Sequence, residues 1–96
     1  MWVFSSALSF LADMGHARRR PKRLAEKLLQ IRKALGLSQR EMANRIGLDV
    51  LPSHISKYER DKSEPGVNVL LAYARIAELG MDQIVDDKLD LEININ

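Results

Sequence analysis

Two glycines eleven positions apart place the strongest constraint on how this 96-residue chain folds. Gly36 and Gly47 enclose a segment that opens with Ser38-Gln39-Arg40-Glu41, an S-x-x-E capping box. In such a box the serine hydroxyl accepts the Glu41 N–H, and the glutamate carboxylate accepts the serine N–H. The inner face of the segment is formed by Met42, Ala43 and Ile46. The pattern predicts a helix of little more than two turns that Gly47 ends.

Apolar spacing predicts another helix just before this segment. Its apolar residues recur at intervals of four, three and four, which places them on one helical stripe: Leu24, Leu28, Ile31 and Leu35. Pro21 suits the first turn, where its missing N–H is no loss. Gly36 suits the left-handed residue that follows a helix end. We therefore expect a helix from Pro21 to the residue before Gly36.

Three more helices are expected after Gly47, although the connection at residues 48–51 remains unassigned. Pro52 suits the first turn of a third helix. The polar stretch 61–66 predicts a loop, a fourth helix ends just before Gly80, and Asp82 is expected to cap a short fifth helix. The inner faces are predicted to hold Ile55 and Tyr58, then Val67, Leu70, Leu71, Ala74 and Ala77, and finally Ile84 and Val85.

Length and composition fit one all-α domain of five short helices with atypical ends. The chain is 46% apolar and 29% charged, as folded domains are. We divide it into an apolar segment and basic arm at 1–20, a helical domain at 21–87 and a tail at 88–96. Residues 2–14 predict either a short helix that covers a patch or pairs with a second copy, or an extension preceding a start at Met14. The tail alternates apolar and polar residues, which predicts a strand that frays or pairs with another chain.

Charge is divided unevenly along the chain. Residues 17–62 contain 13 Lys and Arg against five Asp and Glu, whereas residues 63–96 contain two against seven. A basic block joined to an acidic one is expected where one surface meets a polyanion, and equally where solvated helix faces carry the charge. The run at 18–23 holds five cations in six positions and suits either a flexible leader or an arm along phosphates. We expect the acidic third to face solvent, away from phosphates.

Two short helices joined at Gly47 form a helix-turn-helix candidate, whose second helix would enter the major groove of DNA. The stretch from Ile31 to Gly47, with its G-L-S-Q sequence, resembles the phage-repressor, Cro and Xre-type helix-turn-helix family. The run from Ile55 to Pro65, with I-S-K-Y-E and a later proline, resembles the end of the family's recognition helix and the loop after it. With the helix at 70–79, the similarity spans about residues 24–86. It implies a lambda-repressor-like fold.

The resemblance also implies roles for individual residues. It places phosphate contacts at the start of the second helix, base contacts along the third, and further phosphate contacts in the following loop. The implied DNA-binding residues are Ser38, Gln39, Arg40, Ser53, His54, Ser56, Lys57, Arg60 and Lys62. Arg32 and Glu59 match a pair of residues that forms a partly buried ion pair in several phage repressors.

This chain departs from the family pattern at two places. Eight positions separate Gly47 from Ile55, where the family usually has six, so the rotation of the third helix is left open. Asp61 stands where the family often has glycine, although aspartate tolerates a left-handed backbone better than most residues.

The expected function is sequence-specific DNA binding that regulates transcription, with repression as the expected mode. The partners would be double-stranded DNA with a two-fold operator and a second copy of the chain as homodimer. The alternative is an antitoxin or other protein-interaction module of the same fold, which binds a toxin or another partner protein and regulates its own operon. No enzyme, cofactor or metal site is expected, because no carboxylate pair, phosphate loop or cysteine is present. No apolar run is long enough to span a membrane, and the missing cysteines fit a cytoplasmic protein.

Overall fold

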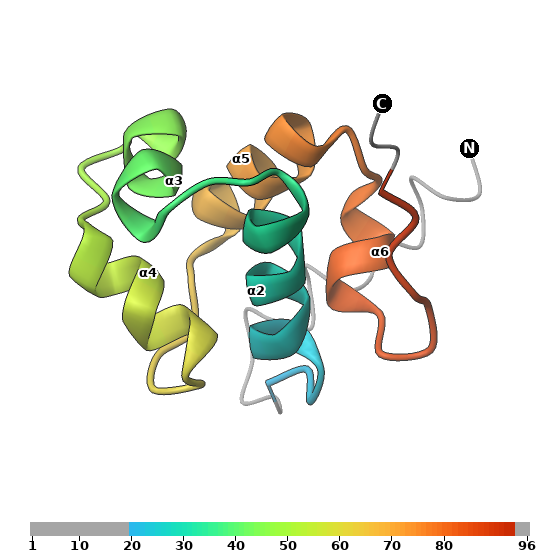
Figure 1. The fold of residues 1–96 in the computed structure, drawn as a ribbon. Coiled ribbons are helices and arrows are strands. Elements are labelled where there is room, and N and C mark those ends of the chain that lie inside the picture. Colours follow the sequence, from blue (N-terminus) through green and yellow to red (C-terminus); the bar gives the residue numbers. More distant parts are fainter. Residues whose placement is uncertain (1–19, 94–96) are drawn as a thin grey trace.

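The computed structural model describes residues 20–93. Over that range the chain forms five helices and no strand, which confirms the expected all-α fold. The helices are α2 (Leu24–Ala34), α3 (Gln39–Ile46), α4 (Pro52–Glu59), α5 (Val67–Ala77) and α6 (Met81–Val85). In Figure 1, α3 and α4 lie on one side of α2, α6 lies on the other, and α5 runs behind.

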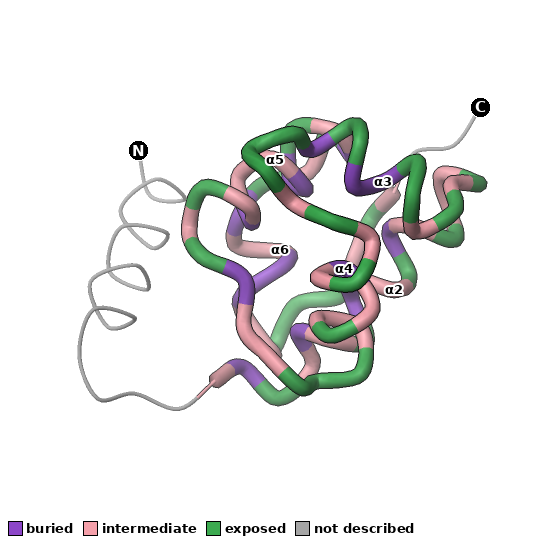
Figure 2. Tube along the Cα trace, turned by 90° about the vertical axis from the view of Figure 1, so that its left-hand side faces the viewer, coloured by how far each residue is buried: buried purple, intermediate pink, exposed green. Residues whose placement is uncertain are grey.

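One apolar core lies between the helices because every helix contributes buried residues at helical spacing. Buried and exposed positions therefore alternate along the trace (Figure 2). The expected stripe on α2 is confirmed, with Leu24, Leu28 and Ile31 buried and Leu35 partly buried. The fully buried side chains of the other helices include Met42, Ile55, Leu70, Tyr73 and Ile84.

The capping box that starts α3 is confirmed by its two hydrogen bonds. The Glu41 N–H donates to Ser38 Oγ at 3.0 Å, and the Ser38 N–H donates to Glu41 Oε1 at 2.8 Å. These bonds lower the pKa of the Glu41 carboxyl below its usual value. Both expected glycine stops are also confirmed, since φ is +71° at Gly36 and +68° at Gly47. Local sequence therefore determines both ends of α3.

The unassigned connection between α3 and α4 is a tight turn with unusual backbone angles. Leu48 and Asp49 have φ of +55° and +60°, a region that a leucine rarely occupies. The Val50 N–H donates to the Gly47 carbonyl at 2.9 Å, which closes the turn around these two residues. This turn accommodates the extra residues before Pro52, which begins α4 as expected.

Three predicted helix boundaries are wrong. Pro21 is not in the first turn of α2, which starts at Leu24, because the Lys22 and Arg23 N–H groups donate to the Asp87 carboxylate instead. The fourth helix ends at Ala77 and not at Leu79, since Glu78 adopts the left-handed conformation at φ +56°.

The third wrong boundary concerns α6. Gly80 is its N-cap, so Asp82 lies inside the first turn and makes no capping hydrogen bond. The extended backbone at Gly80 starts the helix two residues earlier than expected, and the Gln83 N–H donates to the Gly80 carbonyl at 3.1 Å.

The tail does not form a strand over its described part. Leu91 and Ile93 are partly buried against the core, and the Glu92 N–H donates to Gln83 Oε1 at 2.8 Å. The alternation of apolar and polar residues correctly placed Leu91 and Ile93 on the same side of the tail. Both pack on this domain, so this part of the tail does not fray and is not paired with another chain. Residues 1–19 and 94–96, which include the apolar segment and Ile95, lie outside the described residues.

Candidate nucleic-acid interface

The helix-turn-helix unit consists of α3, the turn at 47–51 and α4. The two helices are joined through the core by Met42 and Ile46 from α3 and Ile55 from α4, all of them buried. Figure 1 shows this pair at the edge of the molecule, so the outer surfaces of both helices face solvent. The arrangement gives α4 an exposed face and an accessible amino end.

An ion pair fixes this unit to α2. Arg32 Nε and Nη2 lie 2.6 and 3.0 Å from the two carboxylate oxygens of Glu59, a bidentate arrangement. The side chains are 15% and 5% exposed, so the expected partly buried pair is confirmed. Its hydrogen bonds raise the pKa of the Arg32 guanidinium. Arg32 also donates to the Leu37 carbonyl at 3.0 Å, which ties the segment before α3 to the same group.

Gln39 belongs to the same network. Its Nε2 donates to Glu59 Oε1 at 3.0 Å, so a single carboxylate joins the first residue of α3 to the last residue of α4 and to α2. Sequence comparison assigned Gln39 to phosphate contact only and gave no indication of this bond. The bond holds the side chain at the amino end of α3, where backbone N–H groups favour an anion.

Six of the nine sequence-predicted DNA-binding residues are solvent-exposed, and five of these, all but Ser38, lie on the surface of α3, α4 and the following loop. We call this surface the exposed basic face, and it consists of Arg40, Ser53, Lys57, Arg60 and Lys62. Within residues 20–93, Arg40, Lys57 and Lys62 make no ion pair. Ser53 and Lys57 are one turn apart, so they share one side of α4 while Ile55 is fully buried. Arg60 Nε donates to the Ser56 carbonyl at 3.3 Å.

The remaining predicted residues are less available. Ser38 is exposed, but its hydroxyl oxygen already accepts the Glu41 N–H in the capping box. Ser56 is half-buried. His54 is also half-buried, and its Nδ1 accepts the Leu51 N–H at 3.0 Å, which caps the amino end of α4. Because Nδ1 accepts this bond, Nε2 is the ring nitrogen left for an outside partner.

The loop after α4 has the left-handed residue that the sequence comparison allowed. Asp61 has φ of +58°, and the Lys62 N–H donates to the Lys57 carbonyl at 2.8 Å. Arg20 Nη1 donates to the Asp61 carboxylate and carbonyl at 2.8 and 3.0 Å. The described part of the basic run is thus attached to the domain and is not a flexible leader.

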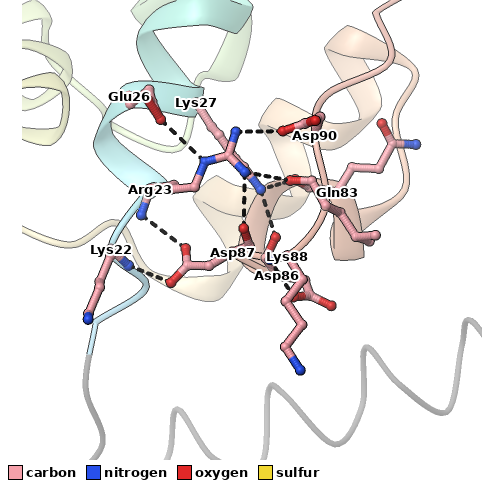
Figure 3. Close-up of polar contacts among 10 residues, drawn as sticks. Lys22, Arg23, Glu26, Lys27, Gln83, Asp86, Asp87, Lys88 and Asp90 are labelled. Atoms are coloured by element: carbon pink, nitrogen blue, oxygen red, sulfur yellow. Dashed lines mark hydrogen bonds and ion pairs between the residues drawn. The ribbon is translucent and has the colours of Figure 1, made fainter.

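A cluster of polar contacts between α2 and the segment after α6 was not expected from the sequence. We call it the α2–α6 clamp, formed by Arg23, Lys27, Gln83, Asp86, Asp87 and Asp90 (Figure 3). Arg23 donates to the Asp87 and Leu89 carbonyls and pairs with Asp90 at 2.8 Å. The acidic third therefore supplies partners to the basic run through Asp87 and Asp90, which its expected role as a solvent-facing surface did not include. That it faces away from phosphates stays a prediction.

Lys27 is the buried residue of the α2–α6 clamp. Its side chain has no exposed surface, and Nζ donates to the Gln83 and Asp86 carbonyls, both at 2.7 Å. Burial lowers the pKa of its ammonium group, and the charge of Arg23 lowers it further. Its position three residues after Leu24 on the apolar stripe was the signal that it faces inward.

Comparison with known families supports the architecture. The sequence model of the helix-turn-helix family, of the Xre and lambda-repressor type, matches residues 28–84, more than half of the chain. The chain belongs to this family of DNA-binding regulators. No curated protein and no solved structure matches the helix-turn-helix chain.

The described residues 20–93 show neither a metal-binding cluster nor a membrane-spanning helix. Residues 20–93 contain no cluster of three or more His, Asp or Glu side chains arranged to hold a metal ion. The same residues include no helix long and apolar enough to cross a membrane.

Proposed function

We propose that this chain is a sequence-specific transcription regulator that binds a two-fold operator as a homodimer and represses the gene beside it. The observation that carries the proposal is the exposed basic face. Its cations have no acidic partners within residues 20–93, and they lie on the two helices of the family's DNA-binding unit and in the loop directly after them. Cations without protein counterions bind DNA by displacing the ions condensed on its phosphates.

The proposed mode assigns separate roles to the two helices. Helix α4 lies in the major groove with Ser53 and Lys57 toward base edges, while Gln39 and the amino end of α3 contact phosphate. Arg60 and Lys62 extend the phosphate contacts beyond α4. A lysine at position 57 donates to guanine O6 or N7, so a G·C pair is expected in each half-site.

Selection of bound sites from random DNA, followed by two lysine variants, tests this proposal. Lys57→Ala should lose about 1–3 kcal/mol on the selected site and relax the preference at one base pair. Lys62→Ala is the matched control on the following loop, and it should weaken all sequences alike and reduce the salt slope by about one unit. Recovery of no preferred sequence would reject the proposed function. Equal weakening of all sequences by Lys57→Ala would instead make Lys57 a phosphate contact.

A further inference from the structure

The turn between α3 and α4 exposes two leucines. Leu48 and Leu51 are 59% and 56% exposed, more than any other large apolar side chain in residues 20–93. Single exposed leucines are common on protein surfaces and need no explanation. Two within a four-residue stretch, one of them next to the first residue of the helix assigned to DNA, suggest that at least one has an outside partner.

The two leucines occupy different surroundings. Leu48 lines a hollow of about 440 Å³, together with Arg45 and Ile46 of α3 and Leu71 and Ile76 of α5. Leu51 is the N-cap residue of α4, immediately before Pro52. Leu48 therefore belongs to the side of the turn that faces α5, whereas Leu51 stands at the amino end of α4.

The backbone of Leu51 is held from both sides. Its N–H donates to His54 Nδ1 at 3.0 Å, and its carbonyl accepts the His54 and Ile55 N–H groups at 2.9 and 3.3 Å. Its φ of −100° is ordinary extended backbone. An apolar side chain is thus presented to solvent from a fixed position, which is the arrangement that a specific apolar contact requires.

The chemistry of the major groove limits which chemical groups the Leu51 side chain could contact there. The amino end of a recognition helix approaches base edges, and the apolar group exposed there is the C5-methyl of thymine. A leucine has no polar atom for a phosphate or for the polar edge of a base. We propose that Leu51 recognises the methyl group of one thymine in each half-site, at the end contacted by the start of α4. This assignment rests on the proposed function.

Substitution of thymine by deoxyuridine provides the test, because it removes the methyl group alone. Each thymine of the selected site is replaced in turn, and affinity is measured for the wild-type protein and for Leu51→Ala. One replacement per half-site should weaken the wild type about three- to fivefold, the effect of exposing one buried methyl group. Leu51→Ala should bind the thymine and uracil sites equally, at the level of the wild type on the uracil site.

Leu48→Ala is the matched control, since it removes an equally exposed leucine from the same turn. It should retain the uracil sensitivity of the wild type. The assignment is overturned if Leu51→Ala keeps that sensitivity, or if no uracil replacement weakens the wild type. It is also overturned if Leu51→Ala changes the oligomeric state in sedimentation, which would make the leucine a protein contact. Failure of the wild type to select any sequence would instead reject the proposed function itself.

Discussion

The α2–α6 clamp and the exposed basic face both contain several cations, yet they use them differently. In the α2–α6 clamp, Arg23 and Lys27 donate to carbonyls and carboxylates of the chain after α6. On the exposed basic face, Lys57 and Lys62 have no acidic partner within residues 20–93. Both groups come from the one basic block, so the local excess of positive charge does not distinguish a stabilising cation from one available to a ligand. The position of the acidic partners makes that distinction.

The largest expected difference between the two regions is in how their substitutions change the salt dependence of DNA affinity. A dimer that makes about 6–10 phosphate contacts should lose about a thousandfold or more in affinity between about 50 and 200 mM salt. Lys62→Ala on the exposed basic face should reduce the slope by about one unit, whereas Lys57→Ala, which removes a base contact, and Lys27→Met in the α2–α6 clamp should leave it nearly unchanged. Filter binding over a salt series measures all four proteins. A flat response of the wild type would favour a protein partner over DNA.

The Arg32–Glu59 pair lies between the two regions and should give the largest loss of stability. Glu59→Ala leaves a nearly buried guanidinium without its carboxylate and should lower the free energy of unfolding by about 3 kcal/mol. The double variant Arg32→Met/Glu59→Leu should lose less, because no buried charge is then left unpaired. Urea unfolding compares the three proteins. A double variant that loses as much stability as Glu59→Ala, or more, would contradict the cost assigned to the unpaired guanidinium.

One substitution made in both regions sharpens the comparison. Lys27→Met removes two charge-assisted hydrogen bonds at the end of α6 and should lower the free energy of unfolding by about 2 kcal/mol. Lys57→Met should leave stability nearly unchanged, because Lys57 is exposed and has no acidic partner within residues 20–93, but it should weaken DNA binding. Thermal unfolding and binding curves check both. Equal stability of the two variants would contradict the role given to Lys27.

The smallest expected effect is a change in acid stability. Burial raises the pKa of Asp87, but the Arg23 and Lys22 N–H groups and the charges of Lys27 and Arg23 together lower it more, so its pKa lies below the usual value. The stability that Asp87 contributes is therefore complete above the ordinary carboxyl range and is lost as pH falls through the folded-state pKa. Asp87→Asn should flatten this acid branch in urea unfolding measured at a series of pH values. If the acid branch is unchanged, the loss of stability at low pH comes from other carboxylates. Glu41→Gln is the comparison, because the pKa of Glu41 is also lowered.

The structure also shows which features the sequence can predict. The start of α3 was predictable because both halves of its cap lie within four residues, Ser38 to Glu41. The start of α2 was not, because the Lys22 and Arg23 N–H groups just before it donate to Asp87, more than sixty positions away. No local pattern connects two such distant positions, so the helix was placed three residues too early. Distance along the chain, more than the strength of the bond, limited the prediction.

The candidate site follows the same rule. The spacing of Ser53 and Lys57 predicted a shared exposed side of α4, and similarity to the family predicted the Arg32–Glu59 pair. The turn at 48–51 was left unassigned because its positive φ angles occur at Leu48 and Asp49, and a Leu-Asp pair is not a sequence that predicts two consecutive residues with positive φ. The cap supplied by His54 was missed for a similar reason, since histidine is an uncommon capping residue.

The Glu59 carboxylate also has a kinetic consequence. Because it holds α2, α3 and α4 at once, the angle between the phosphate-binding helix and the base-contacting helix is set before any ligand arrives. The entropy of ordering this unit is lost during folding and not during binding. Encounter with the target then requires alignment of one rigid body, so the rate of association is governed by diffusion and electrostatic steering, while discrimination between sequences resides in the rate of dissociation.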